Sequence, residues 1–166
     1  MEIKDGIILE PPSDKALLAA VGRVARNGGL LDLVLGMTIK TLTGVTVDEA
    51  LLATQMMSSK DLRKRIKKLA KERLGDGPAL VELEAILQRA QGVMKQRNEL
   101  IHGAWVKKNG KSVVQVPGKG HFPLPTTKEV ERLAQEIRQV YLELNDSRLR
   151  GSLLKALDEK KKKGWG

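Results

Sequence analysis

The chain of 166 residues contains no cysteine, only two histidines, and aromatic side chains at 2% of the sequence. Without cysteine it can form neither a disulfide framework nor a thiolate metal site. His102 and His121 are far apart in the sequence, so we expect no structural zinc site, no other metal and no cofactor. The scarcity of aromatic residues leaves Leu, Ala, Val and Ile to fill the core, which is typical of packed helices.

Long apolar runs are also missing. The apolar stretch over residues 30–37 is interrupted by Asp32, so no segment is predicted to span a membrane. Residues 1–5 lack the basic-then-apolar pattern of a signal peptide. We therefore expect a cytoplasmic protein with no membrane partner.

Positive charge is abundant, because 30 Lys and Arg residues against 20 Asp and Glu give a net charge of +10. Such a balance favours a polyanionic partner, and RNA or DNA more than a membrane. The charge is most concentrated over residues 60–73. The candidate nucleic-acid-binding residues are Lys64, Lys67, Lys68, Lys71 and, further along, Lys95. The alternative is that this segment is simply a solvated helix surface.

Hydrophobic periodicity and capping signals predict several helices. Their expected ranges are 14–43, 46–57, 58–75, 78–102, 126–144 and 149–157. Ser13 is the expected cap of the first range, and Gly28-Gly29 leaves open whether that range is one kinked helix or two. Asn109-Gly110 lies between two β-prone runs and predicts a hairpin over 104–116. Residues 117–125 are predicted to be a loop, and residues 160–166 a mobile tail.

These elements together predict an all-α fold. We expect an up-and-down bundle of about five helices, with a small β-hairpin directly after the helix over 78–102. The predicted organisation is an N-terminal arm over 1–12, a helical domain over 13–145, and a C-terminal helix with a basic tail over 146–166. A chain of this length can bury one hydrophobic core.

The most informative segment is the end of the helix over 78–102, which carries Arg97, Asn98 and His102. At about 100° per residue, Arg97 falls inside the apolar stripe of this helix, and Asn98 and His102 lie together on its flank. Gln91 and Lys95 continue that polar line. A guanidinium that faces a core needs a hydrogen-bonding partner, either a phosphate or a polar network. A chance match to Arg-Asn-x-x-x-His has a probability of about 0.003 in a chain of this composition.

The pattern Arg97-Asn98-x-x-x-His102, which ends a helix and is followed by Gly103, resembles the signature of the HEPN superfamily. The similar helical layout extends the resemblance over most of residues 13–145. It implies a small all-helical domain, and many such domains are RNases of toxin–antitoxin and defence systems with a composite site at a homodimer interface. Some members carry a further acidic-basic motif on an early helix, for which the sequence offers no counterpart.

The chemistry of the motif fits RNA cleavage without a metal. His102 can act as base or acid, because the pKa of a histidine lies near neutrality. Arg97 can hold phosphate oxygens with its planar fork of donors, and Asn98 can orient His102. Because one chain supplies one such histidine and the reaction needs two proton-transfer groups, we expect a homodimer. The sequence thus predicts an endoribonuclease that acts on RNA and leaves 2′,3′-cyclic phosphate ends.

Other interpretations stay open. His102 can be no more than a cap that complements the helix dipole, and Arg97 can extend along the apolar stripe to water. The chain can then be a non-catalytic HEPN-like module that binds nucleic acid or a partner, such as a cognate antitoxin or a nucleotidyltransferase. A purely structural helical dimer is a third reading. We assign no role to His121, and expect Trp105 to anchor the hairpin.

Overall fold

The computed structural model describes residues 2–3, 7–8 and 14–164. The helices of this part of the chain are α1 (Lys15–Thr43), α2 (Val47–Thr54), α3 (Ser59–Leu74), α4 (Pro78–His102), α5 (Thr127–Leu149) and α6 (Ser152–Lys162). The strands are β1 (Glu2–Ile3), β2 (Ile7–Ile8), β3 (Ala104–Lys108), β4 (Lys111–Val116) and β5 (Gly120–Pro123). The prediction of a mostly helical chain is confirmed. The all-α class is too narrow, because the strands form one antiparallel sheet.

The first helix answers the question that the sequence left open, because α1 is a single helix of 29 residues. Gly28 and Gly29 lie inside it without ending it. Its cap is Asp14, whose side chain accepts hydrogen bonds from the backbone of residues 16 and 17. The predicted cap, Ser13, lies outside the described residues. Gly44 ends the helix with φ 76°, a left-handed conformation that glycine adopts without strain.

Later helix starts follow their capping signals. Thr46 and Thr126 each form a capping box with the glutamate three residues on. Ser58 caps α3 in the same position. The predicted helix ends were less accurate, because α5 continues to Leu149 and α6 continues to Lys162. The segment predicted as a mobile tail is therefore helical in its first three residues.

The sheet extends the predicted hairpin on both sides. Strands β3 and β4 pair antiparallel around Asn109 and Gly110, whose φ angles of 51° and 75° fit the turn expected for Asn-Gly. The predicted loop over 117–125 was partly wrong, because β5 lies inside it and pairs with β4. Local signals could not show this strand, since its partner, rather than its own composition, makes it a strand. Strand β2 pairs with the other side of β3.

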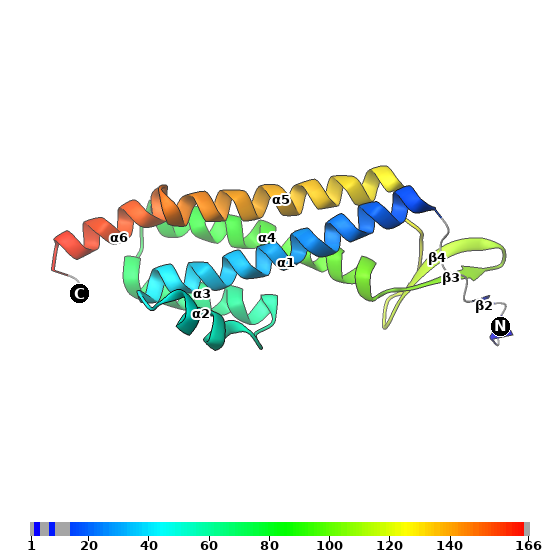
Figure 1. The fold of residues 1–166 in the computed structure, drawn as a ribbon, viewed down its shortest axis with the longest axis horizontal. Coiled ribbons are helices and arrows are strands. Elements are labelled where there is room, and N and C mark those ends of the chain that lie inside the picture. Colours follow the sequence, from blue (N-terminus) through cyan, green and yellow to red (C-terminus); the bar gives the residue numbers. More distant parts are fainter. Residues whose placement is uncertain (1, 4–6, 9–13, 165–166) are drawn as a thin grey trace.

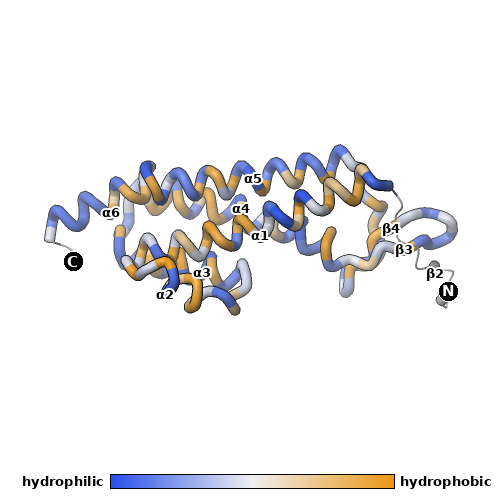
Figure 2. Tube along the Cα trace, viewed as in Figure 1, coloured by the Kyte–Doolittle hydropathy of each residue, from blue (hydrophilic) through white to orange (hydrophobic). Residues whose placement is uncertain are grey.

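The helices form an elongated body with the sheet at one end and the C-terminus at the other (Figure 1). Helix α1 packs along α5 and also against α3 and α4. The apolar faces of the helices turn inward, as the hydropathy colouring shows (Figure 2). Aliphatic side chains fill the core of the described part, with Leu31, Leu35, Leu83 and Ile137 fully buried. This agrees with the expectation from the low aromatic content.

Candidate functional site

The end of α4 is fixed against the sheet by two contacts. Trp105 on β3 donates a hydrogen bond from Nε1 to the carbonyl oxygen of Leu100, at 3.1 Å. Gly103 leaves no room for a side chain, because a Cβ there would overlap Val114 Cγ1 and lie 2.6 Å from the carbonyl oxygen of Glu99. The prediction that Trp105 anchors the hairpin is confirmed. The last turns of α4 are therefore held rigidly where the motif lies.

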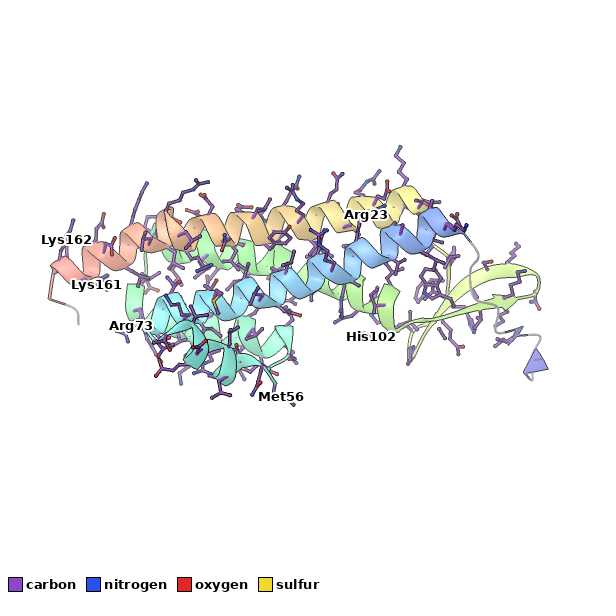
Figure 3. The ribbon with its side chains drawn as sticks, viewed as in Figure 1. Arg23, Met56, Arg73, His102, Lys161 and Lys162 are labelled. Atoms are coloured by element: carbon purple, nitrogen blue, oxygen red, sulfur yellow. The ribbon has the colours of Figure 1, made fainter. Side chains whose placement is uncertain are left out.

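Arg97, Asn98 and His102 come together at this helix end. Arg97 Nη1 donates to Asn98 Oδ1 at 2.9 Å and lies 3.5 Å from His102 Nε2. Asn98 and His102 are exposed, whereas Arg97 is half-buried. His102 is labelled in Figure 3 at the end of α4 nearest the sheet. The imidazole is thus open to solvent and within reach of the guanidinium.

Arg97 lies against a gap in the side chains of α1. A Cβ added to Gly28 would lie 3.1 Å from Arg97 Nε and 3.5 Å from its Cγ, so the guanidinium occupies the space that glycine leaves. Nε itself is buried and has no hydrogen-bond partner among the described residues. Within the described part of the chain, the hydrogen-bond partner that a core-facing guanidinium requires is therefore supplied to Nη1, by Asn98.

Asp32 is a member of this cluster that the sequence interpretation missed. It lies one turn after Gly28 on α1, and its Oδ1 is buried without a hydrogen-bond partner in the described part of the chain. Burial raises the pKa of the Asp32 carboxyl, while a hydrogen bond from Ser59 and the charges of Arg97 and Arg63 act in the opposite direction. A signal was present, since Asp32 interrupts an otherwise apolar stretch, but it pointed only to the absence of a membrane span.

The same carboxylate connects the motif to the basic helix α3. Arg63 Nη1 donates to Ser59 Oγ at 2.6 Å, at the first turn of α3. Burial lowers the pKa of Arg63, and the charge of Asp32 opposes this shift. Side chains from α1, α3 and α4 therefore form one polar cluster around Asp32, which we call the Asp32 cluster: Asp32, Ser59, Arg63 and Arg97.

The predicted nucleic-acid-binding lysines are all exposed. Lys64, Lys67 and Lys71 lie on the outer face of α3, whereas Lys68 lies 4.0 Å from Glu72. Lys95 is on α4, about one turn before Asn98. Four of the five predicted residues therefore lie on α3, and the fifth, Lys95, lies on α4 together with the motif.

The site is an open surface and not an enclosed pocket. A cavity of about 640 Å³ lies on the opposite flank of α4 beside Gln96 and Glu99. Strands β4 and β5 and the first turns of α5 complete its walls, and no motif residue lines it. An open site of this kind suits an extended substrate better than a small molecule.

Two further features bear on the site. Among the residues that the structure describes, no group of three or more His, Asp or Glu side chains is placed to hold a metal ion. None of the helices in this part of the chain has the length and apolar character that crossing a bilayer requires. His121 is half-buried, with Nε2 buried and unpaired among the described groups.

Comparison of the chain with protein-family models, with curated proteins and with solved structures gives no significant match in any of the three. The likeness to the HEPN superfamily therefore depends on the motif and its setting.

Proposed function

We propose that this protein is a metal-independent endoribonuclease whose active site is completed by a second copy of the chain. The observation that carries the proposal is the meeting of Arg97 and His102, 3.5 Å apart, on an exposed helix end. An imidazole and a guanidinium are the two groups that RNA transesterification needs most. The additional resemblance to HEPN RNases supports a role as a toxin or defence effector with a cognate antitoxin or nucleotidyltransferase.

The reaction can be written for one phosphodiester. A base removes the proton of the ribose 2′-hydroxyl, and the 2′-oxygen attacks the adjacent phosphorus. The bond from phosphorus to the 5′-oxygen breaks, and an acid protonates that oxygen, which leaves a 2′,3′-cyclic phosphate and a free 5′-hydroxyl. His102 serves as one proton-transfer group, and Arg97 stabilises the negative charge on the phosphorane oxygens.

Two residues of the same chain prepare these groups. Asn98 accepts from Arg97 Nη1 and so fixes the guanidinium beside the imidazole. Asp32 lies behind Arg97, and its charge helps to hold the guanidinium at the α1–α4 contact. Asp32 is thus our candidate for the acidic residue that some HEPN members carry on an early helix.

The second proton-transfer group comes from a partner copy. One chain has a single histidine at the site, and the exposed line of Gln91, Lys95, Asn98 and His102 leaves this flank of α4 accessible. A two-fold axis next to the helix end would place the partner's equivalent imidazole across the same phosphodiester. Both histidines can then act, one as base and one as acid.

Incubation with mixed RNA in EDTA tests the activity. Wild type should produce fragments with 2′,3′-cyclic phosphate ends, and His102→Ala or Arg97→Ala should lower the rate by at least about 100-fold. His121→Ala is the matched control, because it removes the other histidine and should keep the wild-type rate. Absence of cleavage in wild type, or equal cleavage by His102→Ala, would rule the proposal out.

A mixing experiment tests the composite site. Heterodimers of wild type with His102→Ala should cleave far more slowly than half the wild-type rate, because a site built from two chains loses one of its two proton-transfer groups. A rate of half, with the protein monomeric by light scattering, would show that each chain works alone.

A non-catalytic module that binds RNA is the second candidate, and the exposed basic residues of α3 favour it. Binding that survives His102→Ala, in a wild type without turnover, would select this function.

A further inference from the structure

Helix α3 sorts its charges by face. At 100° per residue, Lys60, Lys64, Lys67 and Lys71 fall within about 60° of one another on the exposed side of the helix. The two acidic residues of α3 fall on another flank, about 100° away, where Glu72 lies 4.0 Å from Lys68. The four lysines, which we call the lysine row, therefore lie apart from the acidic side chains of their own helix.

The lysine row borders the flank of α4 that carries the motif. Arg63 lies between the row and the buried face of α3, and its charge acts with that of Arg97 on Asp32. The other flank of α3 turns toward the end of α2, where Arg65 Nη1 contacts Met57 Sδ at 3.8 Å. The row side of α3 is therefore the side nearer to α4.

The polar line of α4 lies on its flank toward α3. The opposite flank carries Arg89, which forms an ion pair with Glu143 of α5 at 2.6 Å. Lys95 and His102 are about 120–140° away from Arg89 around the helix, so they lie on the flank away from this contact with α5. The lysine row and the polar line thus border one surface, which ends at His102.

We infer that this surface guides one strand of RNA to the site, an inference that rests on the proposed function for its chemistry. The lysines of the row follow each other at about 4.5–6 Å along the helix axis and together span roughly 16 Å. A stacked strand advances about 3.4 Å per nucleotide, so the row covers on the order of five nucleotides. A single line of cations matches the single line of phosphates in one strand. The attack also requires the 2′-oxygen, the phosphorus and the 5′-oxygen to be aligned, and a regular duplex does not allow this alignment.

Direction and selectivity follow from the surroundings of the row. Lys60 lies next to Ser59 of the Asp32 cluster. Lys71 lies in the last turn of α3, which ends at Gly75 close to α6: a Cβ added to Gly75 would lie 3.9 Å from Lys160 Nζ. Figure 3 shows Arg73, Lys161 and Lys162 at the end of the molecule opposite His102. The RNA beyond the scissile phosphate therefore runs from His102 toward α6. Residues 59–74 and 88–102 contain no Phe, Tyr or Trp, so along this surface we expect the strand to be bound through its phosphates and not by stacking of its bases.

The test measures binding without turnover. Fluorescence anisotropy of labelled RNA is recorded with the His102→Ala protein, with single strands of increasing length and a duplex, at 50 to 200 mM salt. The row variant replaces Lys60, Lys64, Lys67 and Lys71 by Gln. The control variant replaces four exposed lysines elsewhere by Gln, with the same change in net charge: Lys15, Lys111, Lys128 and Lys155. Thermal denaturation checks that both variants fold.

We expect the row variant to lower the slope of log affinity against log salt by about 2.8, or about 0.7 for each lysine removed. The control variant should keep the slope of its parent. Affinity should rise with strand length and level off once the row is filled.

Equal losses in the two variants, a duplex bound more tightly than a single strand, or no binding at 50 mM salt would each overturn the inference. Wild type that binds through the row without cleaving RNA would instead refute the proposed endoribonuclease and leave the RNA path standing.

Discussion

Replacement of Gly28 by Ala tests the contact on which the placement of Arg97 depends. Alanine in the interior of a helix normally stabilises a protein by about 0.5–1 kcal/mol relative to glycine. At Gly28 the new Cβ would lie 3.1 Å from Arg97 Nε, so the guanidinium has to move by a few tenths of an ångström. We expect that movement to offset the gain in stability and to change the position of the guanidinium relative to His102.

Two other glycines of α1 are matched controls without a clash. A Cβ on Gly22 or Gly29 would meet nothing within 4 Å, so each Ala variant should gain the full amount. For a domain of this size the gain corresponds to a rise in Tm of about 1–4 °C. Gly28→Ala should instead leave the Tm within about 1 °C of wild type.

Gly36 of α1 is a third control, because a Cβ there would be as close to a neighbouring side chain as at Gly28 but far from Arg97. A Cβ on Gly36 would lie 3.1 Å from Thr54 Oγ1, at the contact of α1 with α2 and away from the motif. Gly36→Ala should therefore lose the gain in stability but keep the cleavage rate. Gly28→Ala should lower that rate roughly 3- to 10-fold, a fraction of the 100-fold associated with a misplacement of about 1 Å.

The assay combines thermal denaturation by circular dichroism with the rate of RNA cleavage in EDTA for all four variants. The reasoning is refuted if Gly28→Ala is as stabilising as Gly29→Ala and cleaves at the wild-type rate. In that case Arg97 is not held against α1, and the tight packing around it has no role in the reaction.

Three further predictions concern the acid behind Arg97 and the link between α4 and the sheet. Because burial raises the pKa of Asp32, the folded state favours the protonated carboxyl, and this stabilisation is complete below about pH 3.9 and lost as the pH rises through the raised pKa. Asp32→Asn should therefore raise the Tm at pH 7 by about 2–4 °C, with no gain at the acid end of a pH series, and should slow cleavage. Gly103→Ala should cost about 1–3 kcal/mol in a denaturant titration, because its Cβ overlaps Val114; a cost below about 0.5 kcal/mol would contradict the tight junction. Trp105→Phe should cost about 1 kcal/mol in the same titration through the lost bond to Leu100, and an unchanged midpoint would count against that anchor.

The sequence was most informative where structure depends on neighbours along the chain. The capping boxes at Thr46 and Thr126, the stop at Gly44 and the Asn109-Gly110 turn are set by side chains a few residues apart, and all were predicted correctly. Strand β5 was not, because its pairing with β4 is a property of two segments.

The candidate site shows the same division. Helical spacing was enough to bring Asn98 and His102 onto one flank of a helix end. Gly28 left open whether residues 14–43 form one helix or two, because only the packed structure shows that its missing side chain makes room for Arg97. Asp32 could not be assigned from sequence, since its neighbours Ser59 and Arg97 lie on two other helices.

The pairing of α1 with α5 has a consequence for synthesis of the chain. Asn27 Nδ2 donates to the carbonyl oxygen of Ala134 at 2.8 Å, and Arg23 pairs with Glu131 at 2.6 Å. Helix α1, which packs beside Arg97, therefore obtains these contacts from residues of α5 that lie more than 100 positions later in the chain. At about 5–20 residues per second, a ribosome needs on the order of 5–20 s to produce that partner. A nascent chain therefore carries the motif before it has the support that holds it, and the proposed cleavage of RNA should begin only after α5 has been synthesised.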